Sequence, residues 1–313
     1  MSSVVKKKKM IKRTYILLIL GMVAFLSACI REDLSDCKSH VFHIDYKADG
    51  EESVIMEYVE DVDVYIFHES GTRLRSYTVT ESHQGVELNL QDGEYTLITV
   101  ANAKEHTYIN EATSDKRHEY FLQHPDWSKA GDVVPTHDHN YIGEVHVKIT
   151  SDGIERRDTV MLRSSHVNME IQIEGLPAPA ARADIPYTLR IENSHARINF
   201  FNELSAMGQE TVQPPLTYDA EKKMYHTTNL ALYRMDQNGE VTRETCPHQV
   251  VLLDADGTEL VRYDLYDYLQ RYADQIDVTK QEATIPLAIQ FHQLGVEIVL
   301  PGWNIEDVNP DWG

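Results

Sequence analysis

The sequence predicts a mainly β protein made of antiparallel β-sandwiches. Short segments in which apolar and polar residues alternate recur along most of the chain, as expected of strands with one buried face. Helical periodicity, in contrast, is scarce. Strands that follow one another with few helices between them are typical of sandwiches and not of a parallel α/β sheet.

The expected strands are spread over the chain from residue 41 to residue 300. They cover residues 41–46, 62–67, 86–90, 95–100, 144–150, 167–173, 187–191, 250–253, 284–291 and 296–300. In the second of them, Val62, Val64 and Ile66 are predicted to share one face of a half-buried strand. The pair Asp92-Gly93 predicts a turn before the strand that follows it.

One segment has a clear helical pattern. Val261, Leu265, Tyr268, Leu269 and Tyr272 would lie on a single face of a helix. We therefore expect a helix over residues 261–272.

Two segments of the chain resemble each other. Residues 65–74 and 251–260, which lie 186 positions apart, both read as an apolar strand, a polar turn ending in Gly-Thr and a returning strand. Glycine-containing turns between strands are common, so this similarity alone does not indicate two related units. It supports them only when the length of the chain is considered as well. A body of this size exceeds a typical single domain.

The N-terminus has the three parts of an export signal. A basic stretch (residues 6–13) precedes an apolar run of 12 residues from Tyr15 to Leu26, and the small residues Ser27 and Ala28 follow. A helix needs about 20 residues to span a bilayer, so the run is interpreted as the core of a cleaved signal peptide covering residues 1–28.

The tetrapeptide that ends at Cys29 resembles the lipobox of bacterial lipoproteins. The resemblance implies cleavage before Cys29, a diacylglycerol on its thiol and an acyl group such as palmitate on its amine. Several acyl chains give a stable membrane anchor where a single chain would not. An ordinary secreted protein with a chance cysteine near the cleavage site is the alternative.

The expected mature chain is strongly acidic. The whole sequence carries a formal net charge of −21, and removal of a signal peptide with six basic and no acidic residues makes it −27. Such a charge disfavours binding to nucleic acid or to an anionic membrane face.

Two further cysteines remain after the lipidation site. Cys37 and Cys246 could form a disulfide in an exported protein, or they could be two unpaired, buried thiols. The sequence leaves both possibilities open, because pairing requires Cα atoms within about 7 Å of each other.

Several segments resemble the fimbrillin-associated anchor lipoproteins of Bacteroides-type (type V) pili. The similar segments are residues 29–37, with Glu-Asp-Leu and a second cysteine after Cys29, and then 62–71, 93–102, 163–176 and 296–303. The resemblance implies two tandem transthyretin-like β-sandwich domains, at residues 29–155 with the lipidated N-terminus and at residues 156–313 with a C-terminal tail. It also implies a lipid-anchored, surface-exposed outer-membrane protein whose partners are pilus subunits that join it by β-strand exchange.

A His-rich loop invites a metal-site hypothesis. His124, His137 and His139 could supply imidazole ligands, but no third or fourth ligand is fixed by the spacing. We therefore predict no metal and no cofactor, with these three histidines as the only candidates. The segment Asp254–Gly257 resembles the start of a calcium loop, but position 12 of that loop would be Leu265 instead of glutamate, so we predict a hairpin turn there.

No pattern in the sequence indicates catalysis. A Gly-x-Ser-x-Gly elbow and phosphate-cradling glycine loops are both absent, and no catalytic residue is predicted. The favoured hypothesis is a non-enzymatic lipoprotein that anchors fimbriae or assists their assembly in cell adhesion. The alternative is a surface β-sandwich lipoprotein that binds a glycan or another ligand.

Overall fold

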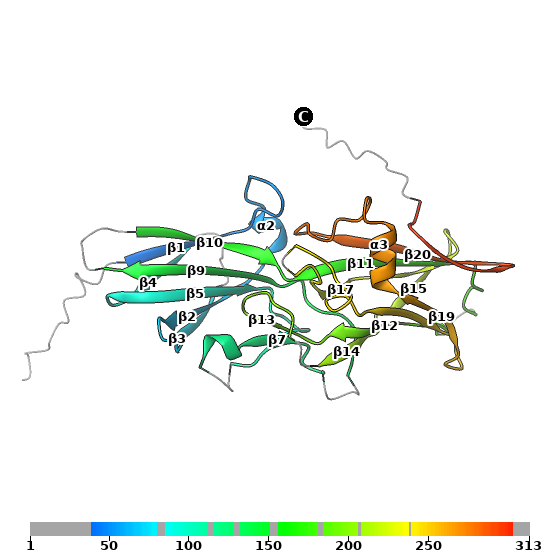
Figure 1. Cartoon of the computed structure of the whole chain (residues 1–313), viewed down its shortest axis with the longest axis horizontal. Coiled ribbons are helices and arrows are strands. Elements are labelled where there is room, and N and C mark those ends of the chain that lie inside the picture. Colours follow the sequence, from blue (N-terminus) through cyan, green and yellow to red (C-terminus); the bar gives the residue numbers. More distant parts are fainter. Residues whose placement is uncertain are drawn as a thin grey trace, which may run out of the picture.

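A computed structural model describes most of the chain after the expected lipidation site. The described residues are 39–79, 85–111, 115–127, 132–150, 156–180, 184–205, 208–237 and 239–302. They form four sheets in an elongated arrangement (Figure 1). The predicted mainly β fold is therefore confirmed. Among these residues, no helix combines the length and the apolarity needed to cross a membrane.

The first sheet has seven strands in the order β3-β2-β5-β9-β10-β1-β4. They are β1 (Ser39–Asp45), β2 (Val62–His68), β3 (Arg73–Val79), β4 (Val86–Asn89), β5 (Gly93–Ala101), β9 (Tyr141–Ile149) and β10 (Arg156–Ser164). All neighbours are antiparallel except β1 and β10, which run parallel. The short helix α2 (Ile55–Tyr58) lies between β1 and β2.

Strand β10 connects two parts of this sheet. Its residues 156–161 pair with β1, and its residues 162–164 pair with β9. The domain boundary expected between residues 155 and 156 stays a prediction, and β10, which begins directly after this point, belongs to the first sheet. The change of sheet falls after β10, which has nine residues, and before β11 begins at His166.

The central strands of the first sheet are buried on both faces. Val62, Val64 and Ile66 share one face of β2, as predicted, and pack with residues of β1, β4, β5 and β9 in one core. Tyr65 and Phe67 on the opposite face are fully buried too. The prediction of a half-buried strand is therefore wrong for β2, because a second layer covers its other face.

That second layer is a three-stranded sheet built from both halves of the chain, which we define as residues 39–164 (N-terminal half) and 166–302 (C-terminal half). It consists of β6 (Tyr108–Ile109), β7 (Phe121–Gln123) and β13 (Arg197–Asn199), and a 3₁₀ turn (Arg117–Glu119) precedes β7. Tyr120, Ile198 and Phe200 from this layer pack against Tyr65 and Phe67. Since β13 follows the first sheet by more than thirty residues, this core joins the two halves of the molecule.

Two further sheets enclose one core in the C-terminal half. The first contains β11 (His166–Glu174), β15 (Leu216–Asp219), β16 (Met224–Thr227), β17 (Leu230–Tyr233), β20 (Thr284–His292) and β21 (Gly295–Val299). The second contains β8 (Val133–Val134), β12 (Thr188–His195), β14 (Gln209–Val212), β18 (Gln249–Leu253) and β19 (Glu259–Asp264). Apolar residues of both sheets form the largest core cluster of the described chain.

The helix predicted over residues 261–272 is shorter than expected. Helix α3 covers only Leu265–Arg271, and Val261 lies instead in β19, where it pairs with Leu252. The physical reason is Asp264, whose side chain accepts a hydrogen bond from the backbone N–H of Asp267 at 3.0 Å and so caps the first turn of the helix.

The two similar sequence segments form the same kind of hairpin. In the turn between β2 and β3, the N–H of His68 donates to Thr72 and the N–H of Gly71 donates to His68. In the turn between β18 and β19, Asp254, Thr258 and Gly257 make the same two bonds, which confirms the predicted hairpin turn. The strand register also shifts at matching points, between residues 66 and 67 and between residues 252 and 253. The two segments, which lie 186 positions apart, therefore resemble each other in backbone geometry as well as in sequence.

Candidate functional site

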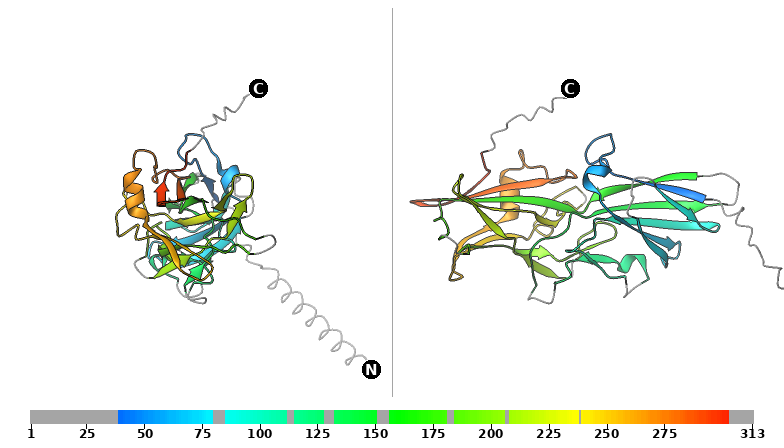
Figure 2. Two further views of the ribbon diagram at one scale, coloured as in Figure 1. Left: turned by 90° about the vertical axis from the view of Figure 1, so that its right-hand side faces the viewer. Right: turned by 180° about the vertical axis from the view of Figure 1, so that it is seen from behind.

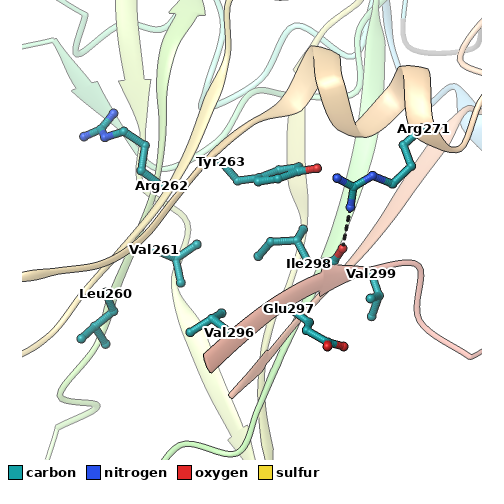
Figure 3. A pocket seen from close by; sticks show the side chains of 9 residues that line it. All are labelled: Leu260, Val261, Arg262, Tyr263, Arg271, Val296, Glu297, Ile298 and Val299. Atoms are coloured by element: carbon teal, nitrogen blue, oxygen red, sulfur yellow. Dashed lines mark hydrogen bonds between the residues drawn. The ribbon is translucent and has the colours of Figure 1, made fainter. Parts of the chain in front are cut away.

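A groove runs between two edge strands of the C-terminal half, β19 and β21. Each of them is the last strand of its sheet and so has only one neighbour within it. The groove, which we call the β19–β21 groove, has a volume of about 550 Å³ (Figure 3). It is lined by Leu260, Val261, Arg262, Tyr263, Arg271, Val296, Glu297, Ile298 and Val299.

The walls of this groove combine six apolar or aromatic residues with three charged ones, Arg262, Arg271 and Glu297. Figure 3 shows Ile298 and Tyr263 between the two strands, whereas Glu297 points away from β19. Val261 is buried at the groove, and Val296 is 41% exposed. Such alternation of side chains follows from the pleat of β21, which places every second residue on the same face.

Helix α3 closes one end of the groove. The Nη1 atom of Arg271 donates to the carbonyl oxygen of Ile298 at 3.4 Å. The hydroxyl of Tyr268 donates to the carbonyl oxygen of Pro286 at 2.5 Å and lies 3.3 Å from that of Val299. Burial raises the pKa of Tyr268, so this hydroxyl remains a donor at neutral pH. The last carbonyls of β21 therefore have partners, while its first residues are exposed.

An apolar side chain protrudes beyond the groove. Leu294 stands at the tip of the β20–β21 hairpin and is completely exposed, and Val296 follows it on the open side of β21. Single exposed apolar residues are common. Here they adjoin a partly apolar groove between two unpaired strand edges, a combination that marks a surface for protein contact.

The groove lies far from the N-terminal end of the described chain. β1 begins at one end of the elongated molecule, and the β20–β21 hairpin reaches the opposite end (Figures 1 and 2). A tether attached before Ser39 would therefore hold the first sheet, and leave the β19–β21 groove at the distant end.

Of the three histidines proposed as metal candidates, His124 and His137 lie near each other, with ring centroids 6.3 Å apart, and His139 lies elsewhere. The Nε2 atom of His124 is 3.1 Å from Nδ1 of His106, and the ring of His139 stacks on His166 with centroids 4.4 Å apart. His137 also makes a buried hydrogen bond with Glu210. Across the described residues, no three His, Cys, Asp or Glu side chains form a group that could hold a metal ion.

The contact between His137 and Glu210 fastens a segment of the N-terminal half to the C-terminal half. Both side chains are almost completely buried, and the ring of Tyr233 lies 4.1 Å from that of His137. The neighbouring strand β8 pairs with β14, the strand that carries Glu210. No local pattern indicated this pairing, because an isolated glutamate in a strand looks like a solvent-facing residue.

The predicted lipidation site and one predicted disulfide partner lie outside the described residues, since both Cys29 and Cys37 precede Ser39. Cys246 is buried in the core of the C-terminal half, and desolvation raises the pKa of its thiol to about 12. A thiol in such a setting is inert. The disulfide between Cys37 and Cys246 stays a prediction.

Comparison with known proteins places these features in a family. Residues 34–309 match the family model of the fimbrillin-A associated anchor proteins Mfa1 and Mfa2. A search of curated proteins found no match.

Solved structures share the fold. The fimbrial anchor protein Mfa2 of Porphyromonas gingivalis is 14% identical, with a TM-score of 0.59, over 85% of this chain and 98% of the other. A candidate adhesin of Bacteroides ovatus is 16% identical, with a TM-score of 0.66, over 85% and 94% of the two chains. A candidate polysaccharide-binding protein of Bacteroides thetaiotaomicron is 16% identical, with a TM-score of 0.65, over 85% and 96%. Since the family model covers nearly the whole chain, the protein belongs to the family of fimbrillin-A associated anchor proteins.

Proposed function

We propose that this protein is a lipid-anchored fimbrial anchor that is tethered to the outer membrane at one end and contacts a pilus subunit at the other. The observation that carries the proposal is the position of the β19–β21 groove at the end of the molecule opposite to β1. Membership of the anchor family supports the fimbrial role. The protein would hold a fimbrial subunit at the membrane surface and would catalyse no reaction.

The tether in this proposal is Cys29. The basic stretch, the apolar core and the small residues before this cysteine support cleavage and acylation there. Only nine residues separate Cys29 from the start of β1 at Ser39, so the first sheet would lie close to the membrane. The charge of the mature chain keeps the body away from an anionic surface.

The two halves are interpreted as tandem transthyretin-like domains. Each contains a hairpin with the same turn, and each has a core between packed strands, although β13 and β8 cross from one half to the other. These crossing strands and the core around Phe200 support a rigid connection between the halves. A rigid connection would hold the groove at a fixed distance from the membrane.

The groove is the proposed docking site for an extended segment of a fimbrial subunit. A strand added beside β21 or β19 would gain main-chain hydrogen bonds, and its alternate apolar side chains would enter the groove between Val261 and Ile298. An extended segment with alternating apolar residues would supply such a strand. The exposed residues Leu294 and Val296 would become buried in that complex.

Release from the membrane tests the tether. Replacing Cys29 by Ala removes the thiol that accepts the lipid, so the variant should appear in the soluble fraction and lose its association with outer membranes. Mass spectrometry of the mature wild-type N-terminus should show an acylated cysteine. A Cys29→Ala protein that stays in the membrane fraction would contradict the proposal.

Copurification tests the fimbrial role. Fibres sheared from cells and sedimented should carry the wild-type protein, detected with an antibody, and fibres from cells that lack the gene should be detached from the cell surface. Absence of the protein from every fibre preparation would contradict an anchor function even if the lipid were present.

A further inference from the structure

A second and larger cavity lies where the two halves of the molecule meet. It has a volume of about 770 Å³, and its lining comes from β9, β10, the turn after β13, the loop after β17 and the loop before β20. We call it the central cleft. Its size falls within the range of small-molecule sites, and such sites often occur between structural units.

The walls of the central cleft are held in place by buried hydrogen bonds. Arg234, which is 6% exposed, donates two hydrogen bonds of 2.8 Å to the two carboxylate oxygens of Asp236 and further bonds to the carbonyls of Val278 and Lys280. The side chain of Asn202 donates to the carbonyl oxygen of Ser164 at 2.9 Å. These contacts join loops of the C-terminal half to each other and to β10, so the cleft is preorganised.

The charges that line the cleft nearly cancel. Two arginines, Arg163 and Arg234, are opposed by three carboxylates, those of Glu144, Glu203 and Asp236. Asp236 is paired with Arg234, and Glu144 is paired at 3.0 Å with an arginine just outside the lining. With these two pairs neutralised, only Arg163 and Glu203 remain, so the cleft offers an anionic phosphate or carboxylate ligand no net attraction and suits an uncharged polar ligand.

Polar groups without protein partners remain available in this cleft. Arg163 is exposed, and its side chain makes no hydrogen bond or ion pair with any described residue. The Oδ1 atom of Asn202 is buried and has no hydrogen-bond partner within the described part of the chain. The cleft thus offers a solvent-exposed donor and a buried acceptor, and a buried acceptor such as the Oδ1 atom of Asn202 normally has a partner.

An apolar patch accompanies these polar groups. Met161 is 41% exposed, and the half-buried ring of Phe201 lies with one face 5.3 Å from the guanidinium carbon of Arg117. A sugar ring combines hydroxyl groups, which need both donors and acceptors, with C–H faces that pack on apolar and aromatic surfaces. The lining of the cleft matches that combination.

We propose that the central cleft binds a neutral sugar unit of a polysaccharide. Arg163 and Asn202 contact its hydroxyl groups, and Phe201 and Met161 pack against its apolar face. The site is separate from the β19–β21 groove, so binding of a glycan does not depend on the fimbrial role and would add ligand recognition to an anchoring subunit.

Methionine methyl groups provide the direct test. The mature protein is labelled at its methionine methyls and titrated in NMR with maltotriose, mannotriose, xylotriose and galactotriose, with trigalacturonate as a charged comparator. The signal of Met161, assigned through Met161→Leu, should shift with at least one neutral trisaccharide. Met56, which is 65% exposed on α2 and does not line the cleft, is the internal control and should not shift.

Substitutions then locate the site. Arg163→Ala and Phe201→Leu should each weaken the binding at least tenfold, while Arg75→Ala on the exposed face of β3 should leave it unchanged. Arg163 is exposed, so its loss does not disturb the core. The proposal is overturned if no neutral trisaccharide shifts Met161 selectively, if trigalacturonate binds most tightly, or if both cleft variants bind like the wild type.

Discussion

The hairpins β2–β3 and β18–β19 share a turn and a register shift but differ in what covers them. The edge of β3 is partly covered at its start, because Arg73 donates its backbone N–H to Asp115 and the 3₁₀ turn donates to Gly71. The edge of β19 instead borders the open β19–β21 groove. Similar local sequence therefore gives similar hairpins, and the segments that pack beside them decide whether an edge is available to a partner.

Strands β2 and β18, which each have two neighbours in their sheets, also differ in how far their side chains are buried. Every residue of β2 from Val64 to Phe67 is buried, because the shared three-stranded sheet covers the second face. In β18 the burial ends earlier, and Leu253, the counterpart of Phe67, is only half-buried. Strand β2 is thus a structural centre of the molecule, whereas the hairpin β18–β19 forms part of an accessible surface.

The largest expected effect distinguishes the edge of β19 from the edge of β3 as a binding surface for fimbriae. Leu260 in β19 lines the groove, and its counterpart Leu74 in β3 is 48% exposed outside it. Leu260→Asp should abolish the recovery of the protein with sheared fimbriae, because the substitution replaces an apolar contact with a hydrated carboxylate that must lose water when a partner covers it. Leu74→Asp is the matched control and should be recovered like the wild type. Equal behaviour of the two variants would remove the distinction between the edges.

The next effect concerns the core between the halves. Phe67→Ala should lower the free energy of unfolding by about 3–5 kcal/mol, as is typical of a fully buried phenylalanine. Leu253→Ala at the matching position should lower it by about 1 kcal/mol, since that side chain is only half-buried. Urea unfolding followed by circular dichroism measures both. A larger loss for Leu253→Ala would show that β18, not β2, is the structural centre.

A smaller and equal effect is expected in the two turns. Gly71 and Gly257 have φ angles of +79° and +80°, and a Cβ added at either position would meet no other atom within 4 Å. Gly71→Ala and Gly257→Ala should therefore each cost about 1–2 kcal/mol, the penalty of a left-handed conformation for an L-residue. Thermal unfolding of the two variants checks the equivalence, which fails if only one of them is destabilised.

The last expected effect is a change in pH dependence, which appears only below neutral pH. Desolvation lowers the pKa of His248, in the C-terminal half, from 6.5 to about 3, so the unfolded chain binds a proton there before the folded chain does. The stability that this histidine contributes is complete above pH 6.5 and is lost as the pH falls toward 3. His248→Phe should make the free energy of unfolding less steep between about pH 7 and pH 4. A slope identical to that of the wild type would exclude the contribution.

Local sequence patterns predicted the local structure well. They did not predict contacts between residues that are far apart in the sequence. The alternation of Val62, Val64 and Ile66 and the Gly-Thr turns reflect neighbouring residues, so they could be interpreted directly. The strands β6, β7, β8 and β13 have only two or three residues each, too few to show a period of two. Their pairing across the two halves was therefore not predicted.

The candidate sites illustrate the same limit. The β19–β21 groove exists because the last strands of two different sheets lie side by side, and the central cleft needs five segments that are distant in sequence. Asp264, which begins α3, was a local signal that could have corrected the predicted helix. No comparable signal connects Arg163 with Asn202, or His137 with Glu210.

Photo-crosslinking in intact fimbriae tests the central claim most directly. A photoreactive phenylalanine analogue is placed at Val296 in the groove or, as a control, at Leu74 on β3, and the crosslinked products are identified by mass spectrometry. We predict that the probe at position 296 crosslinks to a fimbrial subunit and that the probe at position 74 does not. Crosslinks to a fimbrial subunit from position 74 alone, or from neither position in fibres that contain the protein, would contradict the docking role of the groove.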